Sequence, residues 1–167
     1  MSPIDLLNAL SDEDAGKAFE AVCGSKKWVA MMRRARPFDT LDDLQDAGQA
    51  AWQALDPADW LEAFAAHPRI GRRQSSHEND TRGWARTEQN GMDGAPDSLR
   101  SRLAELNEQY EDRFGYIFIV CATGRAADDM LKELETRLTH SPERELPVAA
   151  AEQAKIIRLR IEKLCQP

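Results

Sequence analysis

The chain has 167 residues, of which 42% are hydrophobic, and it carries a formal net charge of −7. This length fits one domain of about 100–200 residues, and the hydrophobic fraction suffices for a core, which excludes wholesale disorder. An acidic surface repels phosphate backbones and anionic membranes, so we expect no nucleic acid and no membrane as partner. A small anionic substrate would need a locally basic pocket.

The cysteines and the chain ends predict a cytoplasmic protein. Cys23, Cys121 and Cys165 are widely spaced and form no CxxC pair, which argues against a disulfide framework and a zinc site. The N-terminus shows no signal-peptide pattern and the C-terminus lacks the usual peroxisomal tripeptide. The longest apolar run, residues 116–122, is far shorter than the ~18 residues that a membrane span requires.

Helix start signals recur in the first 67 residues. Ser11 with three acidic residues after it opens a helix that ends at Gly24, and a second helix is predicted from Ser25 to about residue 34. Thr40 with Asp43 resembles a capping box and opens a helix to about residue 55. Asp56-Pro57 opens a helix that must end near 67–68, because proline disfavours the helical conformation in the residue before it.

The remainder of the chain is also predicted to be helical. Residues 71–83 are polar without apolar periodicity, which predicts a long loop, and loops of this length are often functional. Helices are predicted near 84–90, over 97–114, over 126–138, and from about 143–147 to 164. The run 116–122 has strand propensity but no partner strand, so we expect a buried extended or helical segment. The fold class predicted is all-α, a single compact domain of roughly eight helices over residues 1–167.

His67 is the first candidate for chemistry. It lies at a predicted helix end, in the segment His67-Pro68-Arg69-Ile70-Gly71, directly before the polar loop. Histidine suits proton transfer near neutral pH because its ordinary pKa is about 6.5. Local features alone favour the alternative, in which the imidazole only interacts with the last carbonyls of the helix.

Glu88-Gln89 and Arg160 are the other polar candidates. Glu88 could hold the imidazole of His67 in one tautomer or polarise a substrate hydroxyl, although this segment alone favours a solvated helix surface. Arg160 follows Ile156 and Ile157 at helical spacing, so it projects close to the buried stripe. There its guanidinium could bind a carboxylate, or its stem could merely cover the core.

Other chemistries are not supported by the pattern. The three histidines have no metal-ligand spacing, and the glycines around residues 91–94 do not form a phosphate-binding loop. No nucleophile elbow is present, and Cys121 lies in the apolar run, which is typical of a core thiol.

Three ordered blocks resemble one family, 2-oxo-4-hydroxy-4-carboxy-5-ureidoimidazoline (OHCU) decarboxylase of urate degradation. The first is residues 67–71, the second is Trp84 followed by Glu88-Gln89, and the third runs from Leu106-Asn107 through the apolar segment to the helix at 155–161. The resemblance covers nearly the whole chain. Its one visible departure is Ala85, where the family usually has serine, so one hydrogen bond of about 0.5–1.5 kcal/mol is in question.

The resemblance implies a helical fold, a homodimer, no metal or organic cofactor, and conversion of OHCU to (S)-allantoin and CO2. By the same resemblance His67, Glu88 and Arg160 are catalytic. The residues implied to contact the substrate are Pro68, Ala85, Gln89, Phe118, Ile119, Val120, Cys121 and Ala122.

Two alternatives stay open at this point. The chain could be a helical interaction module that keeps the fold without activity, or a decarboxylase for a related ureido or imidazoline acid. Ala85 and the 71–83 loop are where a change of substrate would appear.

Overall fold

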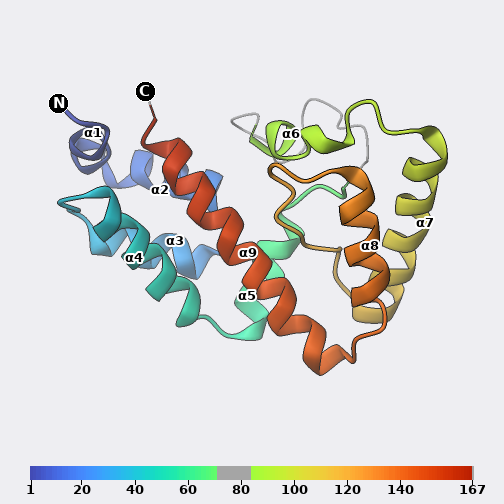
Figure 1. Cartoon of the computed structure of the whole chain (residues 1–167). Helices are drawn as coiled ribbons and strands as arrows, with labels where there is room; N and C mark the ends of the chain where they lie inside the picture. Colours follow the sequence, from blue (N-terminus) through green and yellow to red (C-terminus); the bar gives the residue numbers. More distant parts are fainter. Residues whose placement is uncertain (71–83, 167) are drawn as a thin grey trace. The chain divides into compact units, whose positions relative to one another are not determined.

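The structure is a computed structural model that describes residues 1–70 and 84–166, without the side chains of Ala85 and Arg86. The described residues form nine α-helices and one short 3-10 helix, and none of them forms a β-strand, which confirms the predicted all-α class (Figure 1). The loop predicted at 71–83 lies outside the described residues. None of the described helices is long and apolar enough to cross a membrane.

Two compact units make up the chain. One consists of residues 1–63 and 154–167 and the other of residues 64–153. Two helices continue from one unit into the other, α5 (Pro57–Ala65) and α9 (Pro142–Leu164). The prediction of a single domain over 1–167 stays a prediction.

The first unit contains helices that begin at the capping signals of the sequence. They are α1 (Pro3–Ala9), α2 (Asp12–Val22), α3 (Lys26–Ala35), α4 (Leu41–Gln53), most of α5 and the C-terminal part of α9. The side chains of Ser11, Ser25 and Thr40 each accept a hydrogen bond from a backbone N–H of the first turn, as predicted. The sequence analysis missed α1, which has its own capping box between Ser2 and Asp5.

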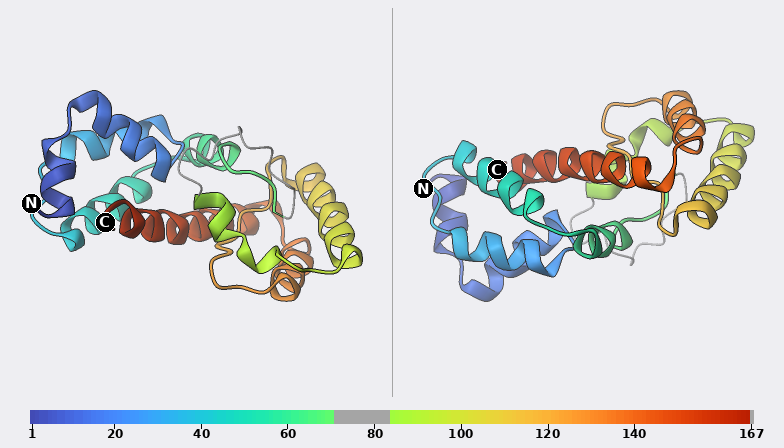
Figure 2. Two further views of the ribbon diagram at one scale, coloured as in Figure 1. Left: turned by 90° about the horizontal axis from the view of Figure 1, so that it is seen from above. Right: turned by 90° about the horizontal axis from the view of Figure 1, so that it is seen from below.

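The core of this unit is built around an aromatic pair. Phe19 and Trp28 meet edge to face with ring centroids 6.1 Å apart, and the indole nitrogen of Trp28 donates to the carbonyl of Gly48 on α4 at 3.0 Å. A Cβ at Gly48 would lie 2.7 Å from Ile161, so the glycine lets α4 and the C-terminal part of α9 approach closely. These two helices run side by side, and both chain termini lie at one end of this unit (Figures 1 and 2).

The second unit is formed by five helical segments and an extended stretch of chain. The helical segments are α6 (Trp84–Glu88), the 3-10 helix η1 (Asn90–Met92), α7 (Asp97–Phe114), α8 (Ala127–Arg137) and the N-terminal part of α9. Helices α7 and α8 pack along each other. Gly115 ends α7 with a φ of 83°, a left-handed conformation that favours glycine, so the helix ends at residue 114 as predicted.

The last helix begins close to the start that the sequence pattern indicated. Helix α9 starts at Pro142, one residue before the predicted range of 143–147, and Pro147 lies inside it. Pro142 occupies the first helical position, where its missing N–H costs nothing, whereas Pro147 lies beyond the first turn and cannot donate to the carbonyl of residue 143.

Candidate functional site

His67 follows the last turn of α5. That helix ends at Ala65, and the backbone N–H of His67 donates to the carbonyl of Phe64 at 3.1 Å. This confirms the predicted helix end, which Pro68 enforces. His67 is half-buried.

The ring nitrogen Nε2 of His67 has a partner that the sequence analysis did not predict. It lies 2.6 Å from Oε1 of Gln153 on α9. Gln153 is completely buried. Its spacing of three and four residues from Ala149, Ala150 and Ile156 was the available signal, because that spacing places a polar side chain on an apolar stripe.

Arg69 and Ile70 fix the segment after His67 to α7. The guanidinium of Arg69 forms two hydrogen bonds with Glu111, one of them 2.9 Å from Nη2 to Oε2. This contact raises the pKa of Arg69, and it pairs the positive charge of the guanidinium with a carboxylate. The amide of Asn107 donates to the carbonyl of Ile70 at 3.3 Å. Residues 69 and 70 are therefore held against α7, and His67 lies just before these two anchored residues.

Glu88 and Gln89 lie at the end of α6. Glu88 is buried, with 9% of its surface exposed, and Gln89 is half-buried. Burial of Glu88 argues against the solvated surface that the sequence left open. The pairing of Glu88 with His67 stays a prediction, and the Nε2 partner that the structure identifies is Gln153. The side chain of Ala85, an implied substrate contact, lies outside the described residues.

The run 116–122 is extended rather than helical. The side chains of Phe118, Ile119, Val120 and Ala122 are buried and that of Cys121 is half-buried. The guanidinium of Arg137 on α8 donates to the carbonyl of Ile119 at 2.6 Å. A side chain thus provides a hydrogen-bond partner for a backbone carbonyl of this segment, so a substrate is not needed to pair every backbone N–H and C=O group there.

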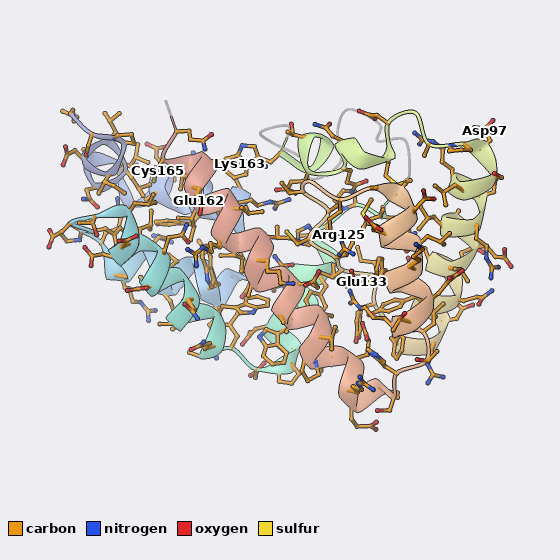
Figure 3. All side chains as sticks on the ribbon, in the orientation of Figure 1. Asp97, Arg125, Glu133, Glu162, Lys163 and Cys165 are labelled. Carbon is orange, nitrogen blue, oxygen red and sulfur yellow. The ribbon has the colours of Figure 1, made fainter. Side chains whose placement is uncertain are left out.

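A second anchor for the same segment comes from α9. The N–H of Cys121 donates to Oε1 of Glu152 at 3.2 Å. Glu152 is 5% exposed, and Arg125 lies 3.9 Å from the same oxygen. Arg125 also pairs with Glu133 of α8, and Figure 3 shows these two side chains together. Two consecutive residues of α9 therefore hold the candidate site: Glu152 contacts Cys121, and Gln153 contacts His67.

A buried polar cluster supports Arg137. The carboxylate of Glu145, with no exposed surface, accepts hydrogen bonds from the hydroxyl of Tyr110 at 2.6 Å and from Nε of Arg137 at 2.7 Å. Its other oxygen lies 2.9 Å from Nδ1 of His140. Burial, followed by the hydrogen bond to Glu145, raises the pKa of Tyr110 well above its ordinary value. His140 is thus a structural residue, consistent with its lack of metal-ligand spacing.

Arg160 belongs to the other unit. Its Nη1 donates to the carbonyls of Ala21 and Val22, at 3.4 and 3.5 Å, at the C-terminal end of α2. A cation is favourable there because the last carbonyls of a helix carry partial negative charge. Arg160 as a whole is half-buried. That Arg160 shares a pocket with His67 stays a prediction.

No group of three or more His, Cys, Asp or Glu side chains able to hold a metal ion occurs among the described residues. The polar groups described above can exchange protons and donate or accept hydrogen bonds. This set suits acid–base chemistry on a polar small molecule.

Comparisons with known proteins agree in pointing to one family. A family model described as OHCU decarboxylase matches residues 8–162. The OHCU decarboxylase of Haloferax volcanii is 29% identical over 156 residues, covering 93% of this chain and 91% of that protein. The uric acid degradation bifunctional protein TTL of Arabidopsis thaliana is 35% identical over 148 residues, covering 87% of this chain and 46% of its own length.

The chain thus spans about half of that bifunctional relative. A crystal structure of OHCU decarboxylase in the presence of (S)-allantoin has a TM-score of 0.77 and 34% identity. The match covers 93% of this chain and 98% of that one.

Proposed function

The chain belongs to the OHCU decarboxylase family, and on that premise we propose that His67 is the acid/base at the centre of its reaction. The protein is a carboxy-lyase that converts OHCU to (S)-allantoin in urate degradation. The observation that carries the role of His67 is its position. It stands first in the complete 67–71 block, at the end of α5, with its ring held by a buried amide.

The reaction sets three tasks for the residues around the substrate. The bond between the ring carbon and its carboxylate must break, with the electron pair entering the ring toward the imine as CO2 leaves. The hydroxyl on that carbon loses its proton and becomes a carbonyl. The neighbouring ring carbon must then receive a proton from one face only, which sets the (S) configuration.

We assign these tasks to the site residues as follows. His67 transfers the proton, because an imidazole exchanges protons near neutral pH. Glu88 engages the substrate hydroxyl, Gln89 orients the ring or the ureido group, and Arg160 binds the anionic oxygens. Pro68 and the extended segment 118–122 form the walls that hold the ring, and Ala85 leaves one hydrogen bond unmade beside it.

The test supplies OHCU freshly generated from urate and follows optically active allantoin by circular dichroism. His67→Gln keeps a hydrogen-bonding group near the position of Nε2 but cannot exchange a proton near neutral pH. We expect it to lower kcat by about 10²–10⁴-fold with an unchanged far-UV spectrum. If His67→Gln decarboxylates at the wild-type rate, the assignment of His67 is wrong. No acceleration by the wild-type protein would contradict the activity itself.

We also propose that the protein acts as a homodimer in the cytoplasm, as the family resemblance implies. Sedimentation equilibrium distinguishes the 18.8 kDa chain from a species of twice that mass. A single species of 18.8 kDa at micromolar concentration would exclude the dimer.

A further inference from the structure

We propose that Gln153 is a positioning residue for His67, which holds the imidazole in the form that carries a proton on Nε2. The inference rests on the proposed role of His67. Its basis is the 2.6 Å contact between Oε1 of Gln153 and Nε2 of His67, made by a side chain with no exposed surface.

The chemistry of the two atoms fixes the tautomer. A carbonyl oxygen only accepts hydrogen bonds, so the ring nitrogen that faces it must carry a hydrogen. Both the imidazolium and one neutral tautomer have Nε2–H, and they differ only at Nδ1. Gln153 is therefore compatible with both states of a proton-transfer cycle, and Nδ1 becomes the nitrogen that gains and loses the proton.

A neutral amide suits this task better than a carboxylate. A carboxylate at Nε2 would orient the ring equally well, but its negative charge would stabilise the imidazolium. The amide orients the ring without adding charge. An imidazole that must both take up and release a proton benefits from that neutrality.

Stability does not explain a glutamine at this position. The amide nitrogen Nε2 of Gln153 is buried and has no hydrogen-bond partner among the described residues. A buried donor of this kind costs about 1–3 kcal/mol, whereas an apolar side chain of similar volume would avoid that cost. The residue thus weakens the fold at one atom while it fixes the candidate acid/base at the other, as expected for a functional role.

The position on α9 makes the orientation rigid. The preceding residue, Glu152, accepts the N–H of Cys121, so the turn of α9 that holds His67 is also tied to the extended segment 117–122. Rotation of the Gln153 side chain is restricted by its burial. Small displacements of a catalytic group lower the rate strongly, so a rigid support has a direct kinetic consequence.

The experiment compares Gln153→Met with Gln153→Glu. Methionine is close in volume and cannot accept the hydrogen bond, whereas glutamate keeps an oxygen at the same reach. Gln45→Met is the matched control, because Gln45 is a half-buried glutamine that donates to α9, at the carbonyl of Arg158, in the other unit.

Two readouts are measured on each full-length variant. Long-range ¹H–¹⁵N spectra of the imidazoles report the tautomer of His67, whose signals are identified by their loss in His67→Gln. Steady-state kinetics on OHCU separate kcat from KM. We expect Gln153→Met to populate the Nδ1–H tautomer and to lower kcat about 10–100-fold with KM within about twofold. Its thermal midpoint should equal or exceed that of the wild type.

Gln153→Glu should keep the Nε2–H form, and Gln45→Met should keep both the tautomer and the kinetics. A purely structural role for Gln153 would lower the thermal midpoint of Gln153→Met and leave the tautomer unchanged. A shift of tautomer without loss of kcat, or a loss of kcat without a shift, would overturn the proposal. Wild-type activity in His67→Gln would instead overturn the proposed function, and the spectra would still report the Gln153 contact.

Discussion

Removal of the Glu145 carboxylate provides a quantitative test of the buried cluster beneath the extended segment. In the native protein this group accepts hydrogen bonds from Tyr110, Arg137 and His140, and it has no exposed surface. Arg137 is 2% exposed. Glu145→Ala therefore leaves a guanidinium buried without its main counter-charge.

The expected cost follows from this burial. Breaking a buried ion pair by removing one partner costs about 3–5 kcal/mol, because the remaining charge is left uncompensated. The residual contacts of Arg137, to the carbonyl of Ile119 at 2.6 Å and to Glu133 at 3.4 Å, offset only part of this. The loss is large against a total stability of about 5–15 kcal/mol for a typical domain. The double variant Arg137→Met/Glu145→Leu leaves no buried charge behind. It should therefore lower the free energy of unfolding by clearly less than the sum of the losses in Arg137→Met and Glu145→Leu.

Urea unfolding followed by far-UV circular dichroism measures these free energies. Arg158→Ala is the control, because Arg158 lies 3.8 Å from Glu162 and both side chains are substantially exposed, so its loss should cost no more than about 1 kcal/mol. If Glu145→Ala lies within about 1 kcal/mol of the wild type, or the double variant costs the sum of the singles, the reasoning about buried charge is refuted.

Three further predictions concern other parts of the chain. Because burial raises the pKa of Tyr110 above its ordinary value of 10.0, the folded state keeps a proton that the unfolded chain loses above pH 10. The free energy of unfolding should thus fall there by up to about 1.4 kcal/mol per pH unit from this group, and Tyr110→Phe should reduce that slope in urea titrations. Burial raises the pKa of the Cys23 thiol to about 12, and the thiolate is the form that reacts. An alkylating reagent at pH 8 should therefore label the half-buried Cys165 well before the buried Cys23. Peptide mass spectrometry measures the order of labelling. A Cβ at Gly91 would lie 1.8 Å from the carbonyl oxygen of Arg125, so Gly91→Ala should lower the urea midpoint. It should also raise KM by shifting the backbone that carries Gln89, two residues before it. Unchanged values of both would contradict this packing.

The helix boundaries were largely predictable because their signals are local. The capping box at Thr40 and Asp43, the N-cap at Ser11 and the glycine at 115 all do what the sequence pattern indicates. The same capping rule predicts α1, but the sequence analysis missed the capping box between Ser2 and Asp5. The start of α9 at Pro142 lies one residue before the predicted range, and Pro147 lies inside the helix.

The candidate site was less accessible from sequence. His67 and Glu88 were found because they lie in motifs, and the structure adds their burial. Gln153 was missed because its partner lies 86 residues away, and its complete burial depends on the folded chain around it. Its spacing on the apolar stripe of the helix indicates a buried face, but no local pattern identifies His67 as its partner.

The manner in which residues 117–122 are held bears on how the protein folds. Arg137 on α8 donates to the carbonyl of Ile119, which lies 18 residues earlier in the sequence. Glu152 on α9 accepts from the N–H of Cys121, which lies 31 residues earlier. A β-strand can form alongside its neighbour one residue at a time, but these hydrogen bonds require both helices to be docked first. Closing such long loops is slow relative to forming the helices themselves, so the segment becomes ordered late in folding. The amide hydrogen of Cys121 should therefore exchange with solvent only when α9 detaches, which makes its exchange rate a direct measure of how cooperatively this unit opens.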